Sequence, residues 1–126
     1  MSERQLTYTQ IGPWNHADVE QAILSDDIEA LLQAVIGIAL HDDDWRYAQD
    51  LCVRLSSHPN FNVRGNAVLS LGHIARVHRR LDQAMVQPII RNALRDSHDY
   101  VRGQAECAVG DTKFFLKWRY DDEQIV

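Results

Sequence analysis

The sequence has few of the features that mark secreted, membrane-spanning or metal-binding proteins. It contains two cysteines and three prolines in 126 residues, and Cys52 and Cys107 lie too far apart for a zinc knuckle or a redox pair. We expect both to be reduced core residues, because free cysteine is among the most buried residue types. The first residues do not resemble a secretory signal, and the longest apolar stretch, residues 31–40, is too short to cross a bilayer. We therefore expect a soluble, cytoplasmic protein without membrane contact.

Motifs of common catalytic sites are also missing. There is no Gly-rich phosphate loop and no Gly-x-Ser-x-Gly elbow. The steps His41-Asp42 and His98-Asp99 look like the paired step of helical phosphohydrolases, but both fall just before expected helices, where Asp is a preferred cap. His73 and His78 are too poorly spaced for one helical face, so we expect them at the surface or rim. We predict no enzyme activity, no cofactor and no metal site.

Charge is unevenly distributed along the chain. The formal net charge is -5, but residues 1–62 hold ten acidic and three basic residues, a net charge of -7, whereas residues 63–126 hold eight acidic and ten basic residues, a net charge of +2. Phosphate binding needs a basic face, so this balance argues against nucleic acid as the main partner. It favours a basic protein partner for the first half of the chain.

One segment of the chain repeats. Val-Arg-Gly-Asn-Ala at residues 63–67 returns as Val-Arg-Gly-Gln-Ala at residues 101–105, and Gly72 and Gly110 keep the same offset. A fixed period of this length indicates a helical repeat. The glycines inside the repeated segment suggest close contacts between helices.

Helical spacing of apolar residues covers most of the chain. The expected helices span residues 15–24, 26–40, 45–55, 62–78, 85–94 and 100–109, followed by an amphipathic piece at 113–120. Short turns make consecutive helices antiparallel neighbours. The predicted fold is all-α, a short right-handed stack of antiparallel helical hairpins.

We expect a single domain, residues 1–126, with atypical ends. Its predicted parts are an N-terminal arm at 1–14, an atypical first hairpin at 15–40, repeats at 43–78 and 82–112, and a C-terminal cap with an acidic tail at 113–126. Phe114, Phe115 and Trp118 would cover the open end of the last hairpin, since a terminal repeat must seal one face of the stack.

The repeated segments resemble the HEAT-repeat family, whose second helix opens with a polar turn followed by Val-Arg and then Ala. The matching residues are Asn60, Val63, Arg64 and Ala67 in one unit, and Asp96, Val101, Arg102 and Ala105 in the next. The resemblance implies that each arginine bonds across its turn while Val and Ala pack between helices. It also implies a HEAT-like α-solenoid, an architecture that usually holds partners.

The candidate partner-binding residues are an acidic group with neighbouring aromatics: Asp42, Asp43, Asp44, Trp45 and Tyr47. One helix cap does not need three consecutive aspartates. Acidic side chains beside exposed aromatics suit a basic partner, because the charges attract it and the rings anchor it.

Size, acidity and fold type together resemble those of cognate inhibitors, such as the immunity protein of a bacterial contact-dependent or polymorphic toxin. This resemblance implies a non-catalytic protein that covers the active or substrate-binding surface of a basic toxin or nuclease domain. A HEAT-like adaptor or scaffold subunit of a larger complex is the alternative. The cluster Arg76, Arg79 and Arg80 is accounted for by the dipole at a helix C-terminus, but it leaves open a nucleic-acid-binding repeat protein.

Overall fold

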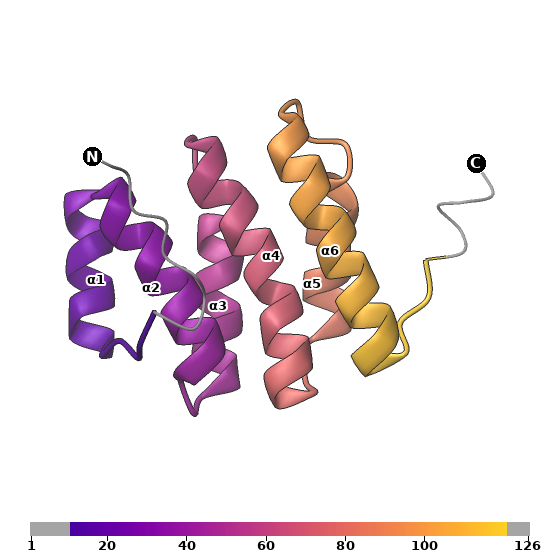
Figure 1. Cartoon of the computed structure of the whole chain (residues 1–126), viewed down its shortest axis with the longest axis horizontal. Helices are drawn as coiled ribbons and strands as arrows, with labels where there is room; N and C mark the ends of the chain where they lie inside the picture. The colour runs from indigo at the N-terminus through magenta and orange to yellow at the C-terminus, as the bar shows by residue number, and fades with distance from the viewer. Residues whose placement is uncertain (1–10, 121–126) are drawn as a thin grey trace.

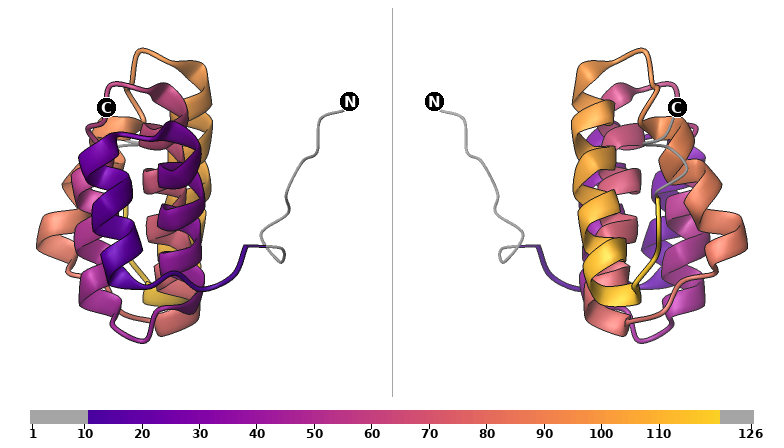
Figure 2. Two further views of the ribbon diagram at one scale, coloured as in Figure 1. Left: turned by 90° about the vertical axis from the view of Figure 1, so that its left-hand side faces the viewer. Right: turned by 90° about the vertical axis from the view of Figure 1, so that its right-hand side faces the viewer.

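The computed structural model describes residues 11–120, which form six helices in two layers (Figures 1 and 2). The helices are α1 (His16–Ser25), α2 (Ile28–His41), α3 (Trp45–Leu55), α4 (Phe61–His78), α5 (Gln83–Ala93) and α6 (Asp99–Leu116). In Figure 2, α1, α3 and α5 form one layer and α2, α4 and α6 the other. Residues 11–120 contain no strand. The all-α helical-repeat fold is confirmed.

Polar side chains fix where the helices begin. Asn15 accepts the Asp18 N–H at the start of α1, and Asn60 accepts two N–H groups at the start of α4. Such caps satisfy donors that a helix leaves unpaired at its first turn. At α6 the expected aspartate cap is wrong. His98 is the N-cap, and its Nδ1 accepts the Tyr100 N–H at 3.1 Å, while Asp99 is already helical.

The centre of the stack is α4, which packs against α2, α3, α5 and α6. Its residues from Gly65 to Ala75 are all buried, whichever way they face. His73 is therefore only 6% exposed, and the expectation of a surface or rim position is wrong. Desolvation lowers the pKa of His73 to about 4, and the nearby positive charge of Arg76 acts in the same direction.

The last helix is longer than its pattern predicts. We expected it to end near Val109, with a separate piece from Lys113, but α6 runs through Gly110 to Leu116 and ends where Lys117 adopts a left-handed conformation. Contact with α4 compensates for the weak helix propensity of glycine, since Asp111 packs against Gly72 of α4. The predicted boundary at residue 113 therefore falls inside a helix.

The chain after α6 turns back over the last hairpin. Trp118 and Tyr120 are buried, and the Tyr120 hydroxyl lies 2.8 Å from Thr112 Oγ1. Phe114 is instead 68% exposed, so its predicted role as part of the cover is wrong. The acidic tail from residue 121 lies outside the described residues.

Within residues 11–120, no further helix follows α6 to cover its outer side. Cys52 in α3 is buried, and burial raises the pKa of its thiol, but Cys107 in α6 is exposed, so its predicted core position is wrong. The equivalent glycines differ for the same reason. A Cβ at Gly65 would meet the Tyr100 ring at 2.8 Å, whereas one at Gly103 would meet nothing within 4 Å. The predicted close contact holds only for Gly65.

Residues 11–14 lie against α2, while the rest of the predicted N-terminal arm falls outside the described residues. Ile11 is buried, and its carbonyl oxygen lies 2.7 Å from His41 Nε2. A Cβ at Gly37 would come within 2.6 Å of the Gly12 carbonyl oxygen, so only glycine leaves room for this segment. None of the helices in residues 11–120 has the length and apolar character needed to span a membrane.

Candidate functional site

The repeated Val-Arg steps lie in the first turns of α4 and α6, the second helices of the α3–α4 hairpin and the α5–α6 hairpin. Arg64 donates from Nε and Nη2 to the two carboxylate oxygens of Asp96, both at 2.8 Å, and from Nη1 to the carbonyls of His58 and Pro59. Hydrogen bonds from Arg64 are the main cause that lowers the pKa of Asp96 to about 2. Arg102 Nη1 donates to the Asp96 carbonyl at 2.8 Å.

The other residues of the repeat motif are packed inside the stack. Val63, Ala67, Val101 and Ala105 are each 0% exposed. Together with the arginine contacts, this burial makes the Val-Arg-Ala pattern a set of residues that hold adjacent hairpins in register.

The aspartates of the candidate acidic group lie in the turn between α2 and α3. Asp44 is the N-cap of α3 and accepts the N–H groups of Arg46 and Tyr47. Asp42 accepts the Asp44 N–H and lies 2.6 Å from His16 Nε2, which ties the turn to the start of α1. Asp43 is exposed and makes no ion pair within residues 11–120. Two of the three aspartates therefore have structural partners.

Tyr47 points toward α1. Its ring stacks on His16 with centroids 3.6 Å apart, and its hydroxyl donates to Glu20 at 3.3 Å. Burial and, after it, the negative charge of Glu20 raise the pKa of Tyr47 to about 12. Tyr47 thus connects the start of α3 to α1 through His16 and Glu20.

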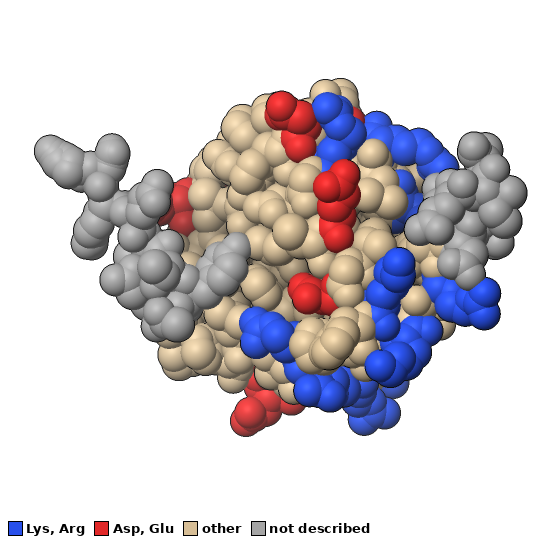
Figure 3. All heavy atoms as spheres, turned by 45° about the vertical axis from the view of Figure 1, so that its right-hand side comes forward, with Lys and Arg blue, Asp and Glu red and all other residues tan. Residues whose placement is uncertain are grey.

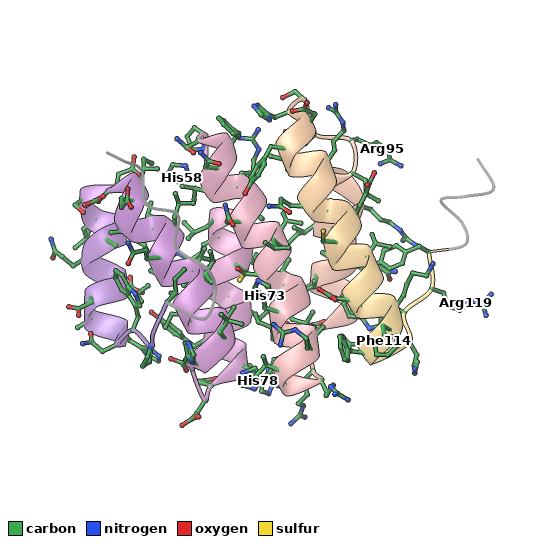
Figure 4. The ribbon with its side chains drawn as sticks, in the orientation of Figure 1. His58, His73, His78, Arg95, Phe114 and Arg119 are labelled. Carbon is green, nitrogen blue, oxygen red and sulfur yellow. The ribbon has the colours of Figure 1, made fainter. Side chains whose placement is uncertain are left out.

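Trp45 lies in a different environment, among arginines. The guanidinium carbons of Arg46 and Arg80 lie 4.9 Å and 5.3 Å from the centroid of the Trp45 rings. Arg79, the C-cap of α4, lies 4.8 Å from the Phe115 ring centroid. Figure 4 shows His78 and Phe114 at the same edge of the stack, where α4 and α6 end.

A hollow of about 420 Å³ opens at this edge. We call it the cationic hollow. Its lining includes Trp45, Arg46, Arg79, Arg80, Leu116 and Trp118. On the face drawn in Figure 3, Lys and Arg gather along the lower and right-hand edge. Residues 63–126 carry ten of the 13 Lys and Arg residues of the chain.

The five predicted partner-binding residues do not share one environment. Asp42 and Tyr47 contact His16 of α1, Asp44 caps α3, and Trp45 lines the cationic hollow. Arg46 and Trp118, which line the hollow, were not among the predicted site residues. The sequence gives little indication that these two residues share a site, since Arg46 and Trp118 come from elements far apart in the chain.

His16, His41, His58 and His98 each have a hydrogen-bond partner within residues 11–120. Besides the His16 contact, His58 Nε2 lies 2.8 Å from Asp26 Oδ1, which links the turn before α4 to the turn after α1. Within the part of the chain that the structure describes, no group of three or more His, Cys, Asp or Glu side chains could hold a metal ion.

Comparison with known proteins agrees with this architecture. A search of curated proteins returns no match. Among solved structures, a chain of the CDI complex from Cupriavidus taiwanensis LMG 19424 is similar, with a TM-score of 0.75 and 26% sequence identity over 90% of this chain and 98% of that chain. The family described as HEAT repeats matches residues 17–110. The chain belongs to the HEAT-repeat family.

Proposed function

We propose that this protein is the cognate inhibitor, or immunity protein, of a toxin–immunity pair. The observation that carries the proposal is the similarity to a chain of a CDI complex, which extends over 90% of this chain and 98% of that chain. Such complexes belong to toxin–immunity systems. A similarity of this extent concerns the whole helical stack rather than one shared hairpin.

The helical stack suits the inhibitor of such a pair better than the toxin. Stacked helical hairpins present extended surfaces to partners. Arg64 and Arg102 both donate to Asp96, and Arg64 also donates to the turn before α4, so these residues serve the stack itself. We infer a non-catalytic protein that acts by covering a surface of its partner.

Charge supports a basic partner. Residues 11–62 hold nine acidic and two basic residues. Glu29, Asp43 and Asp50 are exposed and make no hydrogen bond or ion pair through their side chains among the described residues. Unpaired exposed acids attract a basic surface and accelerate encounter with it. A nuclease or other toxin domain with a basic substrate-binding surface fits this requirement.

The proposal is tested by purifying the tagged full chain from its native host and identifying its partner by mass spectrometry. We expect a small complex with one partner chain that carries a basic domain, and its mass measured by light scattering should correspond to one copy of each chain. Recovery of a large assembly of several subunits, with no toxic component, would favour the adaptor alternative instead.

A further inference from the structure

The cationic hollow has a feature that the proposed inhibitor role does not use. Arg46, at the start of α3, and Arg80, after the end of α4, converge on the same Trp45 rings. Neither guanidinium pairs with a carboxylate among the described residues. Like charges near one another repel, and an aromatic ring beside them screens less than water does. An anion placed between them would be stabilised.

Arg79 adds a third positive charge to the same hollow. Its Nε donates to the Arg76 carbonyl at 3.0 Å, and its guanidinium lies over the Phe115 ring. Its position is therefore already fixed before any partner arrives. A charged group that is held in place loses little conformational entropy when it binds.

The hollow contains one carboxylate of its own, and that group is engaged. Asp82 is the N-cap of α5 and accepts the Met85 N–H, while its backbone N–H donates to Gln49 Oε1 at 2.7 Å. These contacts hold Asp82 at the start of α5. Three arginines against one aspartate leave the hollow with net positive charge.

From these observations we propose that the cationic hollow is a second docking site, which takes a carboxylate-bearing segment of a protein partner. The planar guanidinium group matches a carboxylate with two parallel hydrogen bonds. Trp45 and Trp118 supply apolar walls for the carbon chains of glutamate or aspartate. The volume of about 420 Å³ lies in the range of pockets that bind small ligands or a few side chains.

An acidic protein segment fits the hollow better than nucleic acid does. Guanidinium groups also bind phosphate, but nucleic-acid binding draws its affinity from many basic contacts along a continuous face. The whole chain has a net charge of -5, and the hollow is confined to the edge where α3, α4 and α6 meet. The lining of the hollow includes none of the acidic residues of the first half, and the proposal does not depend on the partner being a toxin.

The test uses the full chain and hexaglutamate peptide as the probe. The binding is followed by NMR through the indole N–H signals of the three tryptophans. Trp45 and Trp118 line the hollow, whereas Trp14 lies beside Gly37 of α2 and serves as the internal control. Hexaglutamate should shift the signals of Trp45 and Trp118 in a saturable manner and leave Trp14 unchanged. Hexalysine should shift neither signal, and added salt should weaken the effect of hexaglutamate.

The double variant Arg46→Gln/Arg80→Gln should weaken hexaglutamate binding by about tenfold or more, because it removes two charge-assisted contacts. Arg54→Gln is the matched control. Arg54 is an exposed arginine of α3 whose Nη1 lies 3.6 Å from Glu20, away from the hollow, and its loss should not change binding. Thermal melting checks that both variants fold.

Three results would overturn the proposal. One is the absence of a Trp45 or Trp118 shift with hexaglutamate. Another is equal binding by a folded Arg46→Gln/Arg80→Gln variant. The third is a single-stranded DNA oligonucleotide that shifts the same two signals at lower concentration than hexaglutamate, which would assign the hollow to nucleic acid.

Discussion

Arg64 of α4 and Asp96 of the turn after α5 form a two-point ion pair, with Nε–Oδ2 and Nη2–Oδ1 distances of 2.8 Å. Their side chains are only 18% and 15% exposed. The same guanidinium also holds the carbonyls of the turn before α4. One side chain therefore connects the α3–α4 hairpin to the α5–α6 hairpin.

Replacement of Arg64 by alanine should destabilise the protein by about 2 to 3 kcal/mol, because it leaves partly buried acceptors and the Asp96 charge without a partner. Arg102→Ala should cost less, about 1 kcal/mol, since Arg102 makes one such contact, to the Asp96 carbonyl. Urea unfolding measures both. Arg54→Ala, which removes an exposed ion pair, should change stability by less than about 0.5 kcal/mol. Equal effects at all three positions would contradict the structural role of the motif.

Replacement of the two repeat glycines, Gly65 and Gly103, by alanine should change stability in opposite directions. Gly103→Ala should stabilise the protein by up to about 1 kcal/mol, because alanine favours the helix and its Cβ meets open space. Gly65→Ala should destabilise it by about 1 to 3 kcal/mol, because the Cβ would overlap the Tyr100 ring. Thermal melting of both variants decides the matter. A gain in stability at both positions would mean that α4 and α6 are not in close contact at Gly65.

Burial of His73 predicts a pH dependence of stability. Its folded-state pKa of about 4 is lower than the ordinary value of 6.5, so the unfolded chain binds the proton more tightly. The contribution of neutral, buried His73 to the free energy of unfolding is therefore complete above about pH 6.5 and is lost as the pH falls toward 4. Because glutamine cannot titrate, the His73→Gln variant should not show the part of the stability loss at low pH that comes from His73.

The measurement is the urea midpoint of wild type and His73→Gln from neutral pH down to about pH 4. Asp111, whose pKa is raised by burial, acts in the opposite direction but is present in both proteins. The difference between the two proteins should change across this range. A constant difference would show that His73 titrates normally in the folded state.

The sequence predicts the helices well because their signals are local. Apolar spacing and turn residues such as Asn15 and Asn60 identify where α1 and α4 begin. The end of α6 depends on a tertiary contact. Gly110 by itself predicts the end of a helix, and only the packing of Asp111 against Gly72 of α4 indicates that the helix continues. The same holds for Cys107, whose exposure follows from its position in the last helix of the stack.

The candidate site is less predictable because it depends on how helices are paired. Trp45 and Tyr47 are neighbours in sequence, but a helix completes a turn in about 3.6 residues, so side chains two positions apart leave on different sides. Tyr47 therefore contacts His16 of α1, and Trp45 contacts Arg80 beyond α4. The antiparallel packing of α3 on α4 brings Arg80 beside Trp45. No local pattern in the sequence indicates this contact.

Charge reversal in the acidic first half should slow association with the partner. The double variant Asp43→Lys/Asp50→Lys changes two exposed residues without structural contacts among residues 11–120, so the fold should be retained. Asp44 is left unchanged because it caps α3 and its loss would cost about 1 kcal/mol. The association rate with a basic partner should fall by about tenfold at low salt, with little effect on dissociation.

The rate is measured by stopped flow against the chain identified by native purification. The difference between wild type and variant should shrink at high salt, because charges on the surface are screened over about 8 Å at physiological ionic strength. Arg46→Gln/Arg80→Gln serves as a comparison, since it removes positive charge and leaves every acidic residue in place. A rate that ignores both the reversal and the salt would mean that the acidic residues do not guide binding.

The most direct test of the inhibitor proposal is growth of bacterial cells that express the captured partner alone or together with this protein. We expect the partner alone to arrest growth and co-expression of this protein to restore it. The folded but weakly associating Asp43→Lys/Asp50→Lys variant should restore growth less. A partner that binds this protein yet leaves growth unaffected when expressed alone would contradict the inhibitor proposal. Growth arrest that persists although the two proteins form a complex would contradict it as well.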